Sequence, residues 1–117
     1  MGASDFWGSW CAPCRKGNPH LVELYKKYSA KGIEFIGLGV SDTDERLREA
    51  IKEDGLLWPN ANTSQSEEGR ELPSVYQVRG VPTKILINPQ GVIEYVETGY
   101  DPSADQLGKK LAAVFGK

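Results

Sequence analysis

Hydrophobic residues recur along the first half of the chain with two periods, one typical of helices and one of buried strands. Between about residues 13 and 31, apolar side chains recur at intervals of three and four positions: Leu21, Leu24, Tyr25 and Tyr28. This spacing predicts a helix, which Gly32 would end. The nearly unbroken apolar run at residues 33–40 is typical of a strand buried on both faces of a parallel sheet. Another strand is expected at residues 3–7, ahead of the helix.

A second helix and a polar stretch follow. Capping side chains at residues 41–44 precede a helix whose apolar face would carry Leu47, Ala50 and Ile51. Gly55 would end it. Residues 60–68 are polar and predict an exposed loop. A short helical turn is expected at residues 71–76, with Pro73 in its first turn.

The C-terminal third predicts a hairpin and a closing helix. Strands at residues 84–87 and 92–98 flank Asn88-Pro89-Gln90-Gly91, which has turn chemistry. The last helix is expected from about Ala104. Its apolar face would consist of Leu107, Leu111, Val114 and Phe115.

The order of these elements predicts an α/β fold, a central mixed β-sheet flanked by helices on both faces. Crossover helices make the first strands parallel, and the short turn makes the last pair antiparallel. A chain of 117 residues fits one domain, residues 1–117, and no repeat or linker divides it.

Composition and charge exclude several classes of function. Fourteen basic residues against sixteen acidic ones give a net charge of −2, so there is no electrostatic case for nucleic acid or an anionic membrane as a partner. No apolar run approaches the roughly 20 residues of a membrane span. The first four residues lack the basic and apolar segments of a secretory signal, so localisation cannot be read from targeting signals.

The chemistry is concentrated in two cysteines, Cys11 and Cys14, placed where a predicted strand gives way to a helix. The helix N-terminus favours the thiolate of Cys11 and lowers its pKa. Cys14 lies one turn further in, more buried and close enough to bond to Cys11. Pro13 in the first turn costs no hydrogen bond and stiffens the loop. The pattern predicts thiol–disulfide exchange in which Cys11 attacks and Cys14 resolves the mixed disulfide.

Simpler interpretations of the same residues remain open at this point. The pair could be a structural disulfide or two incidental thiols. A structural zinc site usually needs four ligands, and His20 is the chain's one histidine, so no metal is expected. Arg15 and Lys16 add positive charge beside the thiols, but exposed charges in a first turn are common.

The sequence around the cysteines, DFWGSWCAPCRK at residues 5–16, closely resembles the active-site segment of the thioredoxin superfamily. Pro19 matches the proline that kinks the active-site helix of that family, and Val81-Pro82-Thr83 resembles its cis-proline segment. The best match is the TlpA/ResA-like group of bacterial thiol–disulfide oxidoreductases, including AhpC/TSA-type redoxins. The long interval between the two motifs leaves room for the extra helical insertion of that group.

The resemblance implies a thioredoxin-like fold and roles for several residues. Pro82 would follow a cis peptide bond, and Val81 would present its backbone beside the dithiol to an extended substrate. Asp5 aligns with the buried acid that accepts a proton from the resolving thiol; a local pairing at the strand end is the alternative.

Two tryptophans and a second acid complete the implied site. Trp10 would flank the substrate surface. Trp7 would pack beside the dithiol or simply fill the core. Asp42 lies near where some relatives carry an acid close to the cysteines, and helix capping explains it equally well.

The resemblance further implies protein disulfide or dithiol substrates, an upstream electron-donor protein, a monomer and an extracytoplasmic location. No cofactor is expected beyond the Cys11–Cys14 disulfide. Relatives have further residues before the active-site strand, so a truncated first strand is expected. Gly17 and Asn18 stand where relatives often place a Glu and an apolar residue, so the helix is expected to be less regular there.

Two other functions compete with protein-disulfide reduction. A peroxidase shares the fold, but the peroxidatic motif Pro-x-x-x-Thr/Ser-x-x-Cys precedes neither cysteine. A non-catalytic binding module would not depend on Cys11 at all.

Overall fold

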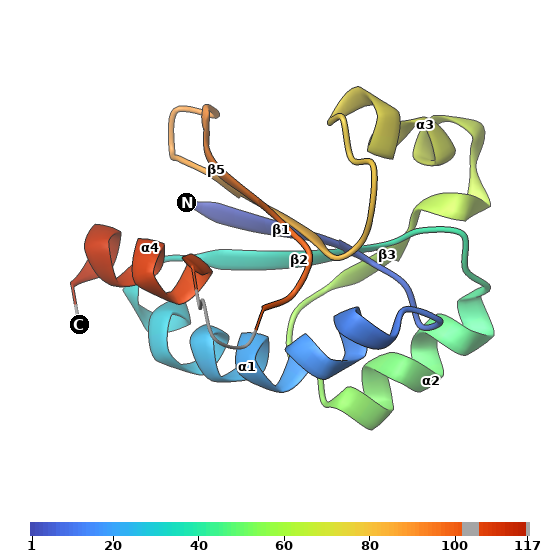
Figure 1. Ribbon diagram of the computed structural model, residues 1–117, viewed down its shortest axis with the longest axis horizontal. Coiled ribbons are helices and arrows are strands. Elements are labelled where there is room, and N and C mark those ends of the chain that lie inside the picture. Colours follow the sequence, from blue (N-terminus) through green and yellow to red (C-terminus); the bar gives the residue numbers. More distant parts are fainter. Residues whose placement is uncertain (102–105, 117) are drawn as a thin grey trace.

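A mixed sheet of five strands forms the centre of the computed structural model, which describes residues 1–101 and 106–116 (Figure 1). Short 3₁₀ helices at Ser29–Lys31 and Thr63–Gln65 supplement the main elements. In chain order the strands and α-helices are β1 (Gly2–Trp7), α1 (Ala12–Tyr28), β2 (Glu34–Gly39), α2 (Asp44–Asp54), β3 (Asn60–Asn62), α3 (Glu67–Val75), β4 (Thr83–Ile87), β5 (Ile93–Thr98) and α4 (Gln106–Phe115).

The strand order is β3-β2-β1-β4-β5, so β1 lies in the middle of the sheet. Strands β1, β2 and β3 are parallel, whereas β4 runs antiparallel to both β1 and β5. The predicted mixed sheet and its C-terminal hairpin are confirmed. Strand β1 has six residues, as many as β2, and is paired on both sides.

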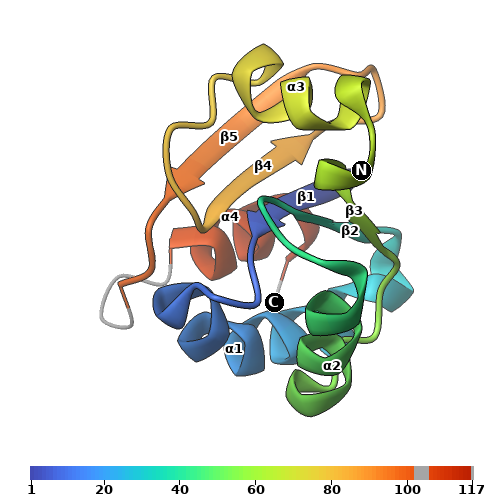
Figure 2. The same ribbon diagram turned by 90° about the vertical axis from the view of Figure 1, so that its right-hand side faces the viewer.

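Helices cover both faces of the sheet, as predicted, but unequally. Helices α1, α2 and α4 lie on one face and α3 lies on the other (Figures 1 and 2). The main core lies between α1, α4 and the sheet. Its buried members are Ala3, Leu21, Leu24, Tyr28, Ile33, Phe35, Trp58, Leu86, Leu107 and Leu111.

A second cluster of buried residues surrounds the cysteines. Trp7 from β1 packs there with Cys11, Cys14, Leu47 and Ala50. The dithiol is therefore built into the packing between β1, the start of α1 and α2, which holds its position.

The prediction of an exposed loop at residues 60–68 is wrong. This segment contains the edge strand β3, a 3₁₀ turn and the start of α3. The side chain of Ser66 caps α3 by accepting a hydrogen bond from the Gly69 N–H at 2.9 Å. The helix therefore begins at Glu67, earlier than predicted, and Pro73 lies in its interior rather than in its first turn.

Helix α1 is continuous from Ala12 to Tyr28, so the expected irregularity around Gly17 and Asn18 is also wrong. Both residues are buried. A Cβ at Gly17 would lie 3.0 Å from the Tyr100 ring, and the Asn18 amide donates to Asp54 at 2.8 Å. These tertiary contacts stabilise a segment of low helix propensity.

Helix α4 packs largely as predicted. Leu107 and Leu111 are buried and Phe115 is half-buried, but Val114 is exposed because it lies at the border of the apolar face. The predicted start near Ala104 lies outside the described residues.

Candidate active site

Cys11 and Cys14 form a disulfide at the N-terminus of α1. Cys11 is the N-cap residue of this 17-residue helix, and its Sγ accepts a hydrogen bond from the Cys14 N–H at 3.3 Å. Both residues are nearly buried, with 5% of Cys11 and 2% of Cys14 exposed. Pro13 occupies the first turn between them, where its missing N–H costs no helical hydrogen bond. One sulfur therefore lies among the unpaired backbone N–H groups of the helix start, and the other lies a turn deeper.

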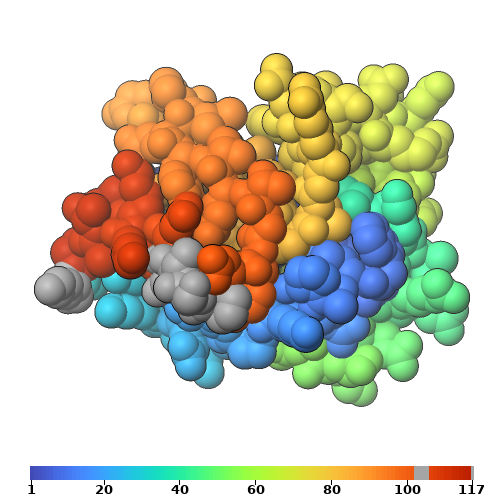
Figure 3. All heavy atoms as spheres, viewed as in Figure 1, coloured from blue at the N-terminus to red at the C-terminus, as the bar shows by residue number. Residues whose placement is uncertain are grey.

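The segment before β4 lies beside this disulfide, although about 70 residues separate the two in sequence. The Val81 carbonyl oxygen is 3.7 Å from the Cys11 Sγ, and the Val81–Pro82 peptide bond is cis. Figure 3 shows the blue start of α1 meeting the yellow segment that leads into β4 at the molecular surface. The structure thus brings together the two motifs on which the sequence analysis depends. Pro82 itself is buried.

The two tryptophans have opposite environments. Trp10 is 56% exposed next to Cys11, and its indole N–H donates to the Val40 carbonyl at 3.0 Å. Its ring covers Gly8 so closely that a Cβ there would overlap it. Trp7 is completely buried, and its indole N–H donates to Asn60 Oδ1 at 3.0 Å. Trp10 is therefore exposed to solvent beside Cys11, whereas Trp7 packs in the buried cluster around the two cysteines.

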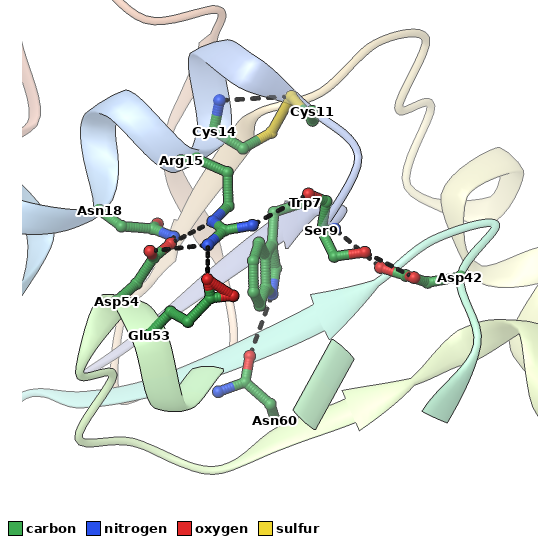
Figure 4. Close-up of polar contacts among 10 residues, drawn as sticks. All are labelled: Trp7, Ser9, Cys11, Cys14, Arg15, Asn18, Asp42, Glu53, Asp54 and Asn60. Carbon is green, nitrogen blue, oxygen red and sulfur yellow. Dashed lines mark hydrogen bonds and ion pairs between the residues drawn. A yellow bond between two sulfur atoms is a disulfide. The ribbon is translucent and has the colours of Figure 1, made fainter. Parts of the chain in front are cut away.

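Asp42 is buried and anchors the loop that precedes Cys11 (Figure 4). Its carboxylate accepts hydrogen bonds from the Ser9 N–H and the Ser9 hydroxyl, each at 2.7 Å. The side chain that caps α2 belongs to Thr43, which accepts from the Arg46 N–H at 3.2 Å. The Asp42 carboxylate also accepts from the Thr43 N–H at 3.0 Å, but Thr43 supplies the side-chain cap of α2, and the two bonds from Ser9 join Asp42 to a segment 33 positions away in sequence.

Asp5 lies on β1 with 8% of its surface exposed. Its Oδ1 has no hydrogen-bond partner among the described residues. Burial raises the pKa of this carboxyl to about 7; the nearby charge of Lys84 lowers the pKa and that of Glu97 raises it. A carboxyl group with this pKa can hold or release a proton near neutral pH, which a proton acceptor must do.

The comparison with known proteins agrees with this geometry. A family model described as thioredoxin-like matches residues 3–93, which contain the disulfide, the Val81–Pro82 segment and the first four strands apart from Gly2. This chain belongs to the thioredoxin-like family.

Individual relatives within the thioredoxin-like proteins are oxidoreductases by name. The thiol-disulfide oxidoreductase ResA of Bacillus anthracis is 38% identical over 93 residues, which are 79% of this chain and 51% of that protein. The chain thus spans about half the length of the curated relatives it matches. The thioredoxin domain of a thiol-disulfide oxidoreductase from Bacteroides vulgatus has a TM-score of 0.80 at 28% identity, covering 94% of this chain and 78% of that one.

A third likeness concerns the fold alone. A putative thiol:disulfide interchange protein DsbE from Chlorobium tepidum superposes with a TM-score of 0.84 at 24% identity. The match covers 99% of this chain and 79% of that chain. The two chains therefore share the same arrangement of helices around the sheet.

A polar network that was not predicted from the sequence joins α1 to the end of α2 (Figure 4). The Arg15 guanidinium donates to both Asp54 carboxylate oxygens, at 2.6 and 3.0 Å, and to the Ser9 carbonyl at 3.2 Å. Glu53 lies 3.8 Å from it, and Asn18 also donates to Asp54. The hydrogen bond to Asp54 raises the pKa of Arg15. Arg15 therefore holds the turn before Cys11 against α2 instead of extending into solvent.

We expect Arg15→Met to lower the free energy of unfolding by about 2 kcal/mol, because it removes the bidentate pair of charge-assisted hydrogen bonds to Asp54. Urea denaturation of the oxidised protein measures this loss. Lys16→Met is the matched control, since Lys16 is exposed one position along the same turn, and it should change stability by less than about 0.5 kcal/mol. Equal effects of the two variants would contradict a structural role for the Arg15–Asp54 contact.

The part of the chain that the structure describes contains no set of side chains suited to bind a metal ion. Within residues 1–101 and 106–116, no group of three or more His, Cys, Asp or Glu side chains could hold a metal ion.

Proposed function

We propose that this chain is the catalytic domain of a thiol–disulfide oxidoreductase that reduces disulfide bonds in protein substrates. The observation that carries the proposal is the Cys11–Cys14 disulfide at the N-terminus of α1, with the Val81 carbonyl oxygen 3.7 Å from the Cys11 sulfur. The names of the relatives, including ResA, support the same reaction class. Residues 1–117 would form one thioredoxin-like domain.

The two cysteines take different roles because their surroundings differ. Once reduced, Cys11 lies at the end of the helix where the backbone N–H groups and the helix dipole stabilise a thiolate. Its neighbour Trp10 is exposed and can contact a substrate. Cys14 is the more buried sulfur and lies within bonding distance of Cys11. Cys11 is therefore the nucleophile, and Cys14 is the resolving cysteine.

The reaction transfers two electrons and needs no further cofactor. The Cys11 thiolate attacks one sulfur of a substrate disulfide, which releases the other sulfur as a thiolate that takes a proton from water. Asp5 accepts the proton of the Cys14 thiol. The resulting Cys14 thiolate attacks Cys11, forms the Cys11–Cys14 disulfide and releases the second substrate thiolate. The substrate disulfide is reduced to a dithiol, and the protein's dithiol is oxidised.

Three residues would position the substrate and the loop. The backbone of Val81, fixed by Pro82, lies where an extended substrate can pair beside the dithiol. Trp10 would cover the substrate from the other side. Asp42 would hold the Ser9–Trp10 loop in place. The loop would in turn determine the direction from which a substrate reaches Cys11.

Return to the dithiol form requires an electron-donor protein with its own dithiol, which we propose as the second partner of a monomeric domain. We also propose that the full protein works outside the cytoplasm, where protein disulfides persist as substrates. In residues 1–101 and 106–116, every helix is too short or too polar to traverse a lipid bilayer.

A redox titration tests the proposed function. We expect the Cys11–Cys14 pair to interconvert reversibly with glutathione or dithiothreitol in a single two-electron transition. A potential near about −270 mV would mark a reductant, and one near about −120 mV would mark an oxidant and reverse the direction proposed here. Thiol alkylation followed by mass spectrometry measures the oxidised fraction. A disulfide that does not equilibrate under these conditions would indicate a structural bond and contradict the proposal.

A further inference from the structure

Three charged side chains form a row across the sheet, on the face covered by helix α1. Asp5 on β1 is directly opposite Lys84 on β4, and Lys84 is directly opposite Glu97 on β5. Directly opposed residues in a sheet project from the same face. The row therefore alternates acid, base and acid over three neighbouring strands, on the face that α1 covers.

Lys84 is the unusual member of this row. It is only 6% exposed, and lysine is rarely buried without an acidic neighbour. Its position between two carboxyl groups supplies such neighbours. Glu97 is half-buried, so the row leads from the buried Asp5 towards solvent.

A partly open cavity of about 200 Å³ lies over the part of the row formed by Lys84 and Glu97. Asp5 does not line the cavity but is the neighbour of Lys84 on the adjacent strand. Lys84 and Glu97 form its sheet side, and Gly17 and His20 of α1 form part of its helix side. Gly17 contributes no side chain to the space, and Tyr100 packs against it. The cavity is large enough to hold several water molecules between Lys84 and the surface.

We propose that Lys84 and Glu97 are positioning residues of the thiol–disulfide reaction, which set when Asp5 holds a proton and connect it to solvent through this cavity. The inference rests on the proposed function, in which Asp5 takes the proton of Cys14. After the disulfide has formed, the Asp5 carboxyl group must lose that proton before the next turnover. Water in the cavity beside Lys84 and Glu97 can receive it.

The two residues act on Asp5 in opposite directions. The positive charge of Lys84 favours the Asp5 carboxylate, whereas the negative charge of Glu97 favours the protonated form. Other charged groups also face the space between α1 and the sheet. The charged and titratable side chains that line the cavity from all packed elements are His20 from α1, Lys84 from β4, Glu97 from β5, and Tyr100 and Asp101 after β5.

The test is a titration of Asp5 by carbon-detected NMR in the oxidised protein, where neither cysteine titrates. We expect Lys84→Met to raise the midpoint of the Asp5 titration by about one pH unit and Glu97→Gln to lower it by a smaller amount. Lys84→Arg keeps the charge and should leave the midpoint near that of the wild type. Lys16→Met, which removes an exposed lysine of α1, should not move it.

A second readout connects the titration to the reaction. The rate at which Cys14 resolves a preformed mixed disulfide should depend on pH with a midpoint that follows Asp5, to higher pH in Lys84→Met and to lower pH in Glu97→Gln. Glu97→Gln changes a half-buried position and provides this test even if Lys84→Met fails to fold.

The outcomes separate this inference from the proposed function. Midpoints of the Asp5 titration that stay unchanged in both variants, or that move in the same direction, would overturn the role of Lys84 and Glu97. If the wild-type protein is still active in that case, the proposed function stands. A wild-type protein that reduces no disulfide would instead reject the proposed function, whatever Asp5 does.

Discussion

Replacement of Cys11 by serine is expected to lower the reduction of insulin by dithiothreitol to the rate measured without protein. A serine hydroxyl is far less acidic than a thiol and cannot form a disulfide, so no mixed disulfide can form with the substrate. Insulin turbidity at neutral pH measures the rate. Ala12→Ser is a matched control, because it introduces the same hydroxyl group at the neighbouring exposed position and keeps both sulfurs. It should retain turnover.

Cys14→Ser should have a different phenotype, although it also abolishes turnover. Here Cys11 still attacks the substrate, but no second thiolate can release it, so a mixed disulfide accumulates. Non-reducing electrophoresis and intact-mass spectrometry should detect the adduct in Cys14→Ser and not in Cys11→Ser. An adduct formed through Cys14 in the Cys11→Ser variant would reverse the assigned roles. Full activity of Cys11→Ser would indicate a binding module instead of an enzyme.

The elements that could be predicted from sequence are those whose stability is local. Helix α1 and the β4–β5 hairpin have a clear apolar period or turn residues. The hairpin strands lie within one residue of their predicted bounds, and α1 begins one residue before and ends three residues before the predicted positions. Strand β3 has neither, because Asn60–Asn62 is a polar edge strand paired on one side only. It is held by the Trp7–Asn60 hydrogen bond, which spans 53 positions. No local pattern carries that information.

The candidate active site likewise combines features that could be predicted from the sequence with features that could not. The motifs around Cys11 and Pro82 are short and could be found by reading along the chain. The contacts that support them join residues far apart, Ser9 to Asp42 over 33 positions and Arg15 to Asp54 over 39. An isolated Asp or Arg in a sequence has many possible partners, so a single sequence cannot select the right one. The Ser66 cap of α3 is different, since it is a local signal that could have been recognised.

Asp5 should make the stability of the oxidised protein fall as pH rises from about 4 to about 7. Its pKa is near 3.8 in the unfolded chain and about 7 in the folded protein, because burial disfavours the carboxylate. Between these two values the folded protein holds a proton that the unfolded chain has lost, so folding is favoured at the acidic end of the range. This proton contributes roughly 4 kcal/mol to the free energy of unfolding at the acidic end, and the contribution is lost by about pH 7.

Asp5→Asn removes this dependence and keeps the size of the side chain. Relative to the wild type, the variant should therefore gain stability as pH rises from 4 to 8, by up to about 4 kcal/mol, since its amide is neutral throughout. Urea denaturation of both oxidised proteins at several pH values gives the difference. Glu49→Gln on the exposed face of α2 is the control and should follow the wild type. A constant difference between Asp5→Asn and the wild type over this range would mean that Asp5 is already ionised in the folded protein at pH 4, and Asp5 could then not serve as the proton acceptor for Cys14 near neutral pH.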